Sequence, residues 1–360
     1  MLHVFHIHSN TCYISAFGVI HEHSIPNEDV IFILCRNLPI LHKEIKCFRI
    51  DDDLYYFPFL RNNQLHNFKF LHSKDRIREI DSMIENEIDQ EFIYYVHNSR
   101  NYLYRIIITH HLCKEVRFIE DGLDMYLDRK EFDRKYPVKV WLRHKIINFV
   151  LGHLLGIYRR IHQPNQPFHN KSTETPKIYG LTDLSFQKFI DPSYEYKSLD
   201  TQNLQKIQDY KLKPGTNVFV LTALVEQHVA KPNEVEALLK WYVEKFNINE
   251  VKLNFHPHQS QNTRKHIVSV FEKNSVKVEI IPDEIIMEVL FINNHGLNVF
   301  GTGTSLLIYA TIFSPSSKVY ALYPFFKKHL NRNTIRTIFW ENTFSKIRND
   351  NFNLYLRDFE

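Results

Sequence analysis

From residue 217 onward, short apolar runs alternate with longer segments in which apolar residues recur at helical spacing. The pattern predicts strands at 217–224, 251–257, 276–282, 297–301 and 318–324, and helices at 233–247, 263–274, 285–293 and 304–313. Within the first of these helices the apolar Val235, Leu238 and Val243 share one face. Because strand–helix alternation is typical of a mainly parallel sheet covered on both faces, we expect a doubly wound α/β domain here.

The first half of the chain shows a similar alternation. Strands are predicted at 2–8, 29–36, 46–50, 91–97, 115–119 and 178–186, and helices at 13–20 and 99–114. Residues 161–177 are rich in Pro, Asn, Ser and Thr and predict a surface loop, and the polar stretch 191–217 predicts the connection between two domains. We therefore predict an N-terminal domain over 1–205, a C-terminal domain over 206–345, and a tail over 346–360 that packs back on the first domain. Two doubly wound domains in succession predict a pair that face each other across a cleft.

One segment, 139–162, has an apolar centre with basic residues on both sides. It predicts either an amphipathic helix packed on the domain or a peripheral contact with an anionic membrane, with Arg143, Lys145, Arg159 and Arg160 near the headgroups. Its uncharged part is shorter than the roughly 20 residues that span a bilayer. The first residues do not resemble a signal peptide, so we expect a cytoplasmic protein, with possible attachment to the inner face of the inner membrane.

Composition agrees with an ordered globular protein of more than one domain. The chain has 360 residues, of which 44% are hydrophobic and only 9 are glycine. Its net charge of +4 is mild, and we expect no nucleic-acid partner. The four cysteines form neither a CxxC pair nor a zinc-like spacing, which favours a reducing compartment over a disulfide framework.

The stretch "EVRFIEDGLDMYL" (115–127) ends a buried strand at two acids and a glycine. Gly122 permits a sharp exit from the strand with positive φ. The two acids, Glu120 and Asp121, are explained either by a turn or helix cap or by a catalytic base at the mouth of a cleft.

Polar residues also follow three strands of the second half. His256 and Pro257 follow one strand, and the sequence "GTGTS" from Gly301 to Ser305 precedes a helix, where backbone N–H groups and hydroxyls favour an anion such as phosphate. After another strand come Asp283, Glu284 and Glu288, and a carboxylate there is able to accept both hydroxyls of a ribose. All of these residues are expected at the carboxyl edge of one sheet, which suggests a nucleotide site.

Three short motifs therefore occur in a fixed order: Glu120-Asp121-Gly122, His256-Pro257 and Thr304-Ser305. This ordered set resembles that of the bacterial two-domain GT-B sialyltransferases, which include lipooligosaccharide sialyltransferases and capsule polysialyltransferases. The resemblance covers the layout of the whole chain rather than its residue-by-residue sequence. Thr304 stands where a serine is commoner, and it retains the hydroxyl.

The resemblance implies an inverting glycosyltransferase that moves sialic acid from CMP-sialic acid to a hydroxyl of a cell-surface glycan, with no metal and no other cofactor. It implies Glu120 as the base that takes the acceptor proton, with Asp121 orienting the turn or the acceptor. His256 would stabilise the departing phosphate. The donor-binding residues it implies are His256, Pro257, Glu288, Gly303, Thr304 and Ser305. Glu288 is favoured over Glu284 for the ribose.

Three alternatives remain at this point. In the first, the donor is another CMP-activated nonulosonic acid, such as pseudaminic or legionaminic acid. In the second, the chain is a non-catalytic glycan-binding or capsule-assembly protein of the same fold. The third concerns metal: "DDD" at 51–53 resembles an Asp-x-Asp metal motif, but we favour a solvated acidic turn there. The adjacent His110 and His111 are expected to point in different directions along a helix and to bind no metal.

Overall fold

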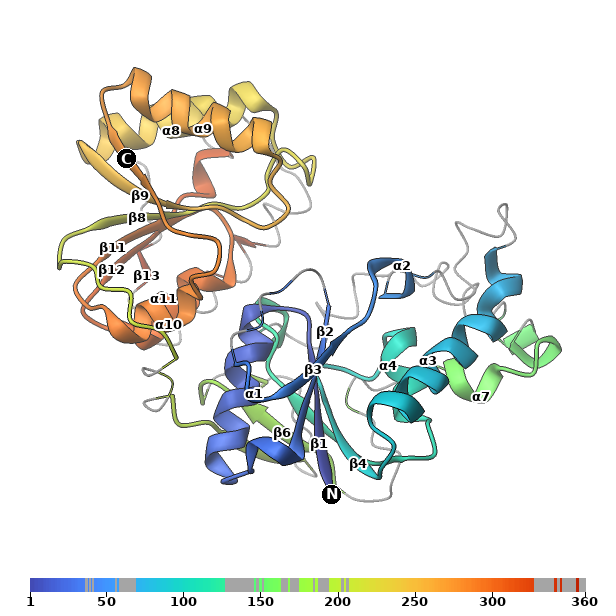
Figure 1. Cartoon of the computed structure of the whole chain (residues 1–360). Coiled ribbons are helices and arrows are strands. Elements are labelled where there is room, and N and C mark those ends of the chain that lie inside the picture. The colour runs from blue at the N-terminus through green and yellow to red at the C-terminus, as the bar shows by residue number, and fades with distance from the viewer. Residues whose placement is uncertain are drawn as a thin grey trace. The chain divides into compact units, whose positions relative to one another are not determined.

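A computed structural model of the chain describes 1–35, 38, 40, 42–55, 57, 69–126, 146, 149–150, 152–162, 168, 175–183, 185–186, 194–201, 204, 207–326, 340–341, 344 and 354–355. The chain divides into two compact units, Met1–Thr201 and Gln202–Glu360, where the sequence placed the boundary between 205 and 206. Each unit contains one sheet with helices on both of its faces (Figure 1).

The first unit is built on a seven-stranded parallel sheet in the order β3-β2-β1-β4-β5-β6-β7. Its strands are β1 (Leu2–Ile7), β2 (Val30–Leu34), β3 (Lys46–Arg49), β4 (Phe92–Val96), β5 (Cys113–Ile119), β6 (Lys177–Gly180) and β7 (Glu195–Ser198). Its α-helices are α1 (Asn10–Glu22), α2 (Asp52–Tyr55), α3 (Ser73–Glu87), α4 (Tyr102–Ile108) and α7 (Tyr158–Ile161). The helix α1 covers one face of the sheet, and α3 and α4 cover the other (Figure 1).

The second unit contains a six-stranded parallel sheet in the order β10-β9-β8-β11-β12-β13. Its strands are β8 (Asn217–Val220), β9 (Glu250–Asn254), β10 (Lys277–Ile280), β11 (Asn298–Gly301), β12 (Lys318–Ala321) and β13 (Leu354–Tyr355). Its helices are α8 (Pro232–Phe246), α9 (Gln261–Lys273), α10 (Met287–Asn293) and α11 (Ser305–Phe313). The pair α8 and α9 covers one face and the pair α10 and α11 the other (Figure 1). The strand order is that of a Rossmann fold, 3-2-1-4-5-6.

Both sheets form because their central strands are apolar on both faces. All residues of β2 and β4 are buried, and in β1 Val4, Phe5 and Ile7 are fully inaccessible. Continuous apolar strands of this kind are stable only between two layers of helices. The predicted fold class, two doubly wound Rossmann-like α/β domains in succession, is confirmed.

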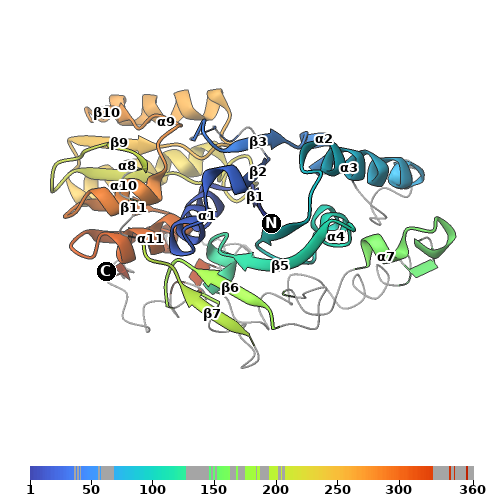
Figure 2. The same ribbon diagram turned by 60° about the horizontal axis from the view of Figure 1, so that its bottom comes forward.

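Three elements of the first unit lie outside the predictions: the short helix α2, the helix α3 and the strand β7. The helix α3 buries Ile77, Ile80 and Ile84, whose spacing is helical, but the predictions named no element in this region. Residues 195–198, assigned to the connection between domains, instead form β7, which pairs with β6 at the edge of the sheet (Figure 2). The residues of β7 are alternately exposed and half-buried, so this edge strand has almost no hydrophobic pattern from which to predict it.

The basic segment 139–162 is described only in part. Residues 152–154 are helical, and Gly156, with φ of 69°, ends this helix before α7 begins. The described part of the segment therefore does not form a single continuous helix. Arg160 does not reach outward: its guanidinium binds both oxygens of Asp81, at 2.8 and 2.5 Å. Arg143 and Lys145 lie outside the described residues.

The described residues of the predicted tail, Leu354 and Tyr355, pair with β12 in the second sheet. The rest of 346–360 is outside the described residues.

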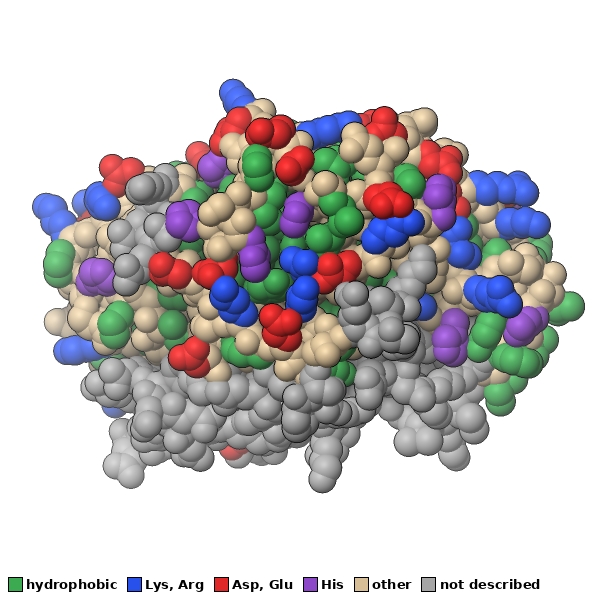
Figure 3. All heavy atoms as spheres, turned by 90° about the horizontal axis from the view of Figure 1, so that it is seen from below, with side chains coloured by type: hydrophobic (Ala, Val, Ile, Leu, Met, Phe, Trp, Pro, Cys, Tyr) green, Lys and Arg blue, Asp and Glu red, His purple; other side chains and the backbone are tan. Residues whose placement is uncertain are grey.

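Figure 3 shows one face of the molecule on which acidic and basic side chains are interspersed over the coloured surface. No described helix combines the length and the apolar character needed to cross a membrane.

Candidate active site

In the first unit, polar residues meet where three adjacent central strands end. His8 directly follows β1, His97 directly follows β4, and Glu120 and Asp121 directly follow β5. Parallel strands have their carboxyl ends at the same edge of the sheet, so these residues lie together there. The strand order reverses between β1 and β4, and doubly wound sheets bind ligands at such a point. Gly122 leaves the strand with φ of 132°, as predicted, which only glycine adopts readily.

The two acids of the motif lie in different surroundings. Glu120 is completely buried, and its carboxylate accepts hydrogen bonds from the Tyr126 hydroxyl at 2.7 Å and from the Leu181 backbone N–H at 2.6 Å. Burial, followed by the negative charge of Glu120, raises the pKa of the Tyr126 phenol. These bonds join the end of β5 to the segments that follow β5 and β6. Glu120 therefore stabilises the local fold.

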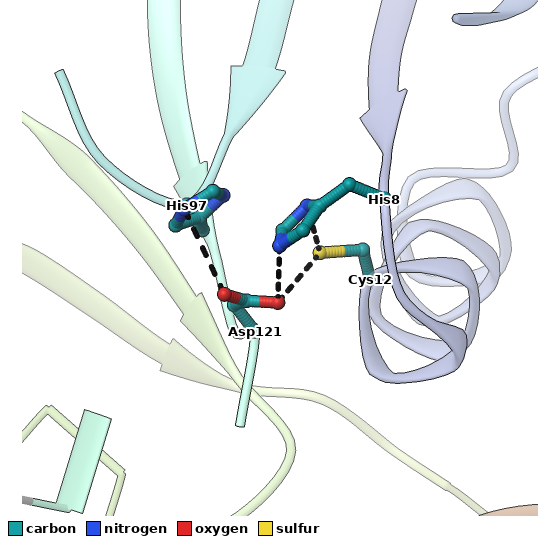
Figure 4. Close-up of side chains that lie close together, drawn as sticks. All are labelled: His8, Cys12, His97 and Asp121. Carbon is teal, nitrogen blue, oxygen red and sulfur yellow. Dashed lines mark hydrogen bonds and ion pairs between the residues drawn. The ribbon is translucent and has the colours of Figure 1, made fainter. Parts of the chain in front are cut away.

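Asp121 instead belongs to a cluster with the imidazoles of His8 and His97 and the thiol of Cys12 (Figure 4), and it also contacts the hydroxyl of Ser9. Its Oδ1 lies 2.7 Å from His8 Nε2 and accepts hydrogen bonds from Ser9 Oγ at 2.9 Å and Cys12 Sγ at 3.4 Å. Its Oδ2 lies 3.7 Å from His97 Nε2. The Asp121 side chain is 22% exposed, whereas Glu120 has no exposed surface.

The surroundings of Asp121 determine its charge. Burial raises the pKa of the carboxyl, but the electrostatic interactions with His8 and His97 and the hydrogen bonds from His8 and Ser9 outweigh burial and hold the pKa well below its usual range. Burial and the charge of Asp121 raise the pKa of the Cys12 thiol. At neutral pH the cluster thus contains an ionised carboxylate beside a neutral thiol.

In the second unit, His256 occupies the turn between β9 and α9. Its backbone N–H donates to Gln259 Oε1 at 2.7 Å, and its Nδ1 accepts from the His258 backbone N–H at 3.1 Å. Because Nδ1 is an acceptor, the proton of a neutral His256 ring is on Nε2, where it serves as a hydrogen-bond donor. Pro257, which follows, is exposed.

The "GTGTS" turn joins β11 to α11. Thr304 is the N-cap of α11, and its Oγ1 accepts the Leu306 N–H at 3.3 Å. The hydroxyls of Thr302 and Thr222 are 2.5 Å apart and tie the end of β11 to the end of β8. A Cβ added to Gly303 would come within 2.0 Å of the Trp340 ring, so glycine is required for this close packing. The half-buried Thr304 and Ser305 begin the helix where an anion is favoured.

The position of these two turns in the sheet suits a nucleotide. In the strand order β9-β8-β11, the His256 turn and the Thr304 turn are separated by one strand, which corresponds to about 10 Å between their strands. Glu288, in the first turn of α10, is only 3% exposed, so it is not a solvated surface residue of that helix. Asp283 and Glu284 are exposed, and Asp283 pairs with Arg264 at 2.7 Å.

Sequence reasoning missed four members of the Asp121 cluster: His8, Ser9, Cys12 and His97. For His8 and His97 the available signal was a polar residue directly after an apolar strand, the same signal that identified His256, whereas Cys12 lies inside α1 and has no such signal. The acids at 51–53 are exposed at the start of α2 and belong to none of the metal-binding groups found among the described residues. His110 and His111 lie in a turn after α4 with ring centroids 4.4 Å apart, so the expectation that they diverge along a helix was wrong.

Both Rossmann-like units thus carry polar residues at the carboxyl edge of their sheets, an acid–imidazole group in the first and the Thr304 turn in the second, where doubly wound sheets bind ligands. A family model described as alpha-2,8-polysialyltransferase (POLYST) matches residues 8–323. The chain belongs to this family, and it is a sialyltransferase that acts on a nucleotide-sugar donor and a glycan acceptor. No curated protein matches the sequence.

The chain is similar in fold to solved structures of low sequence identity. A putative UDP-N-acetylglucosamine 2-epimerase from Listeria monocytogenes is 12% identical, with 96% of this chain and 86% of that chain covered and a TM-score of 0.49. UDP-GlcNAc 2-epimerase from Neisseria meningitidis is 13% identical, with coverages of 85% and 79% and a TM-score of 0.46. An alpha,alpha-trehalose-phosphate synthase from Burkholderia vietnamiensis is 8% identical, with coverages of 97% and 96% and a TM-score of 0.40.

Proposed function

We propose that the protein transfers sialic acid from CMP-sialic acid to a glycan hydroxyl, with inversion at the anomeric carbon and without a metal ion. The observation that carries the proposal is the arrangement in the second unit, where the His256 turn and the Thr304 turn flank the end of β8 at the carboxyl edge of one sheet. This is where doubly wound sheets bind nucleotides. Membership of a sialyltransferase family makes a CMP-activated sugar the fitting occupant.

The donor side stabilises the leaving group. His256 Nε2–H donates to the phosphate of CMP as the bond from the anomeric carbon to the phosphate oxygen breaks. The Thr304 and Ser305 hydroxyls and the backbone N–H groups at the start of α11 contact the same phosphate. Glu288 accepts the ribose hydroxyls, and this role requires its buried carboxylate to be reached from the nucleotide site. Since these groups carry the leaving-group charge, the transfer itself needs no cation.

The acceptor side removes one proton. We assign the base to Asp121, because its carboxylate is ionised and partly exposed, while both oxygens of Glu120 accept hydrogen bonds inside the first unit. The acceptor oxygen bonds to the anomeric carbon on the face opposite CMP, and its proton passes to Asp121. A carboxylate of low pKa suffices, since the proton becomes strongly acidic once the new C–O bond forms. His8 positions Asp121 and stabilises its charge.

The family description favours a particular acceptor. An alpha-2,8 linkage joins the anomeric carbon of one sialic acid to O8 of another, so the acceptor is a glycan that ends in sialic acid, as in a capsular polymer. This acceptor class is more specific than the lipooligosaccharide-or-capsule expectation from the sequence.

A peripheral membrane contact at the cytoplasmic face is proposed for the segment around 146–154. Ile146, Phe149, Val150 and Leu154 are exposed and fall at helical spacing on one side, and Arg159 is exposed nearby in sequence. Co-sedimentation with vesicles rich in anionic lipid tests this contact. Replacement of Phe149 and Leu154 by Ser should abolish binding, and unchanged binding would refute the contact.

Transfer is tested directly with CMP-sialic acid and a fluorescent acceptor that ends in sialic acid, with CMP release and elongated product as the two measurements. The same assay with CMP-activated pseudaminic and legionaminic acids decides the donor. CMP binding without transfer to any acceptor would favour a non-catalytic glycan-binding protein. Neither binding of CMP nor turnover of a CMP-activated sugar would refute the proposal.

A further inference from the structure

His8, Cys12, His97 and Asp121, here called the first-unit quartet, bring four metal-ligating groups together from three strand ends and one helix (Figure 4). One ligand atom from each residue lies within 4.8 Å of the ligand atoms of the other three. Two imidazoles, a thiol and a carboxylate are the ligand types that zinc prefers. We propose that the first-unit quartet binds one Zn²⁺ ion, and that an ion bound there inhibits sialyl transfer.

The spacing of the quartet fits a tetrahedral ion. Bond lengths of about 2.0–2.3 Å from zinc to N, O and S place neighbouring tetrahedral ligands roughly 3.3–3.7 Å apart. Cys12 Sγ lies 3.4 Å from Asp121 Oδ1, within this range, and one ligand atom from each of the four residues lies within 4.8 Å of the others. The hydrogen bond between His8 and Asp121, at 2.7 Å, must open slightly as the ion replaces its proton.

The quartet is also held rigidly. His8, His97 and Asp121 follow directly, or by one residue, the ends of β1, β4 and β5, and Cys12 lies in the first turn of α1. Ser9 is the N-cap of α1, accepting the Cys12 N–H at 3.1 Å, while its hydroxyl donates to Asp121 at 2.9 Å. Outer hydrogen bonds of this kind orient metal ligands and raise affinity.

Binding of zinc and transfer of a sugar compete for the same carboxylate. Zinc coordination releases the Cys12 thiol proton to solvent and gives a thiolate. The coordinated Asp121 is then no longer available to accept the proton of the acceptor hydroxyl. The inhibitory part of this inference rests on the proposed transferase function, but the metal site does not.

Metal binding is measured on the full chain by equilibrium dialysis with ZnCl₂ and by titration with Co²⁺, whose thiolate complexes absorb strongly in the near ultraviolet. Wild type should bind one Zn²⁺ in the quartet and show the cobalt–thiolate band. Cys12→Ser should lose the band and weaken zinc binding by more than about 100-fold, beyond the loss that changes to outer partners cause. Cys113→Ser, which removes another buried thiol of the first unit, is the matched control and should keep both signals.

A second group, Glu85, His110 and His111, also has its ligand atoms within 4.8 Å but contains no thiol, so Co²⁺ bound there gives no cobalt–thiolate band. If Cys12→Ser fails to fold, His97→Gln replaces it and should weaken zinc binding while shifting the cobalt spectrum. Absence of the band in wild type, or its persistence in Cys12→Ser, overturns the metal site.

Inhibition is measured as transfer with added Zn²⁺ and then with a chelator. Wild type and Cys113→Ser should lose transfer in proportion to zinc occupancy and recover on chelation. Zinc at a concentration that inhibits wild type should leave Cys12→Ser at its own metal-free rate, because the ion no longer binds the quartet. Full transfer by zinc-saturated wild type overturns the inhibition. If the protein transfers no sugar at all, the proposed function fails, and dialysis and the cobalt spectrum still decide the metal site.

Discussion

The two acids of the Glu-Asp-Gly motif provide the sharpest test of the proposed chemistry, because each has a near-isosteric amide variant. Asp121→Asn removes the proton acceptor but keeps the side-chain shape. A positioned general base contributes typically 10²–10⁴-fold, so kcat should fall by that factor, which is a barrier increase of about 3–5.5 kcal/mol. The KM for CMP-sialic acid should change little, since the donor contacts are assigned to the second unit.

Glu120→Gln should act on stability instead. The variant keeps an acceptor for the Leu181 N–H, and the Tyr126 hydroxyl can turn to accept from the new amide, because Thr182 Oγ1 lies 3.3 Å away as an alternative partner. What is lost is the charge in two hydrogen bonds, each of which contributes about 1.5–3 kcal/mol when a carboxylate accepts it. We expect the free energy of unfolding of the first unit to fall by about 1–3 kcal/mol and kcat to fall less than tenfold.

Both variants are compared with wild type by single-turnover transfer with CMP-sialic acid and by thermal unfolding followed by circular dichroism. Glu120→Gln should unfold at a lower temperature and still transfer, and Asp121→Asn should lose transfer. If folded Glu120→Gln loses transfer a hundredfold or more while Asp121→Asn remains active, the assignment is reversed and Glu120 is the base, as the family resemblance first implied.

Three further predictions concern other parts of the molecule. His256→Ala should lower kcat roughly 10²–10³-fold through loss of a donor to the leaving phosphate, with exposed His258→Ala as the control that keeps the backbone donor to His256; equal kcat in both variants would contradict the role of His256. Gly303→Ala should lower the free energy of unfolding by about 1–3 kcal/mol and weaken CMP binding in calorimetry, because the added Cβ meets the Trp340 ring. The double variant Gly303→Ala with Trp340→Leu should regain part of the binding, and purely additive losses would refute the packing argument. Asp121 has a folded-state pKa below its unfolded value of about 3.9, so its stabilising contribution is present above that pH and is lost as the pH falls below it. In urea unfolding, the free energy of unfolding should therefore decrease less with falling pH for Asp121→Asn than for wild type. Parallel pH curves for the two proteins would contradict the shift.

The amino-acid sequence by itself was sufficient for the fold class. In the second unit every predicted strand and helix is present within a few residues, because apolar runs and helical spacing alternate there without interruption. The first unit was less regular: the edge strand β7 carries almost no hydrophobic pattern, and α3, although amphipathic, was overlooked. The motifs around Glu120, His256 and Thr304 also identified the family, which the match over residues 8–323 establishes.

Only the tertiary structure decided what surrounds each acid. Glu120 and Asp121 are neighbours in sequence, but successive residues at a strand end point in opposite directions, so one enters the interior and the other joins His8 and His97. The sequence separations between His8, His97 and Asp121 contain no sign of this proximity. It follows from the strand order β1-β4-β5, which is set by how the helices pack on the two faces of the sheet rather than by any local pattern.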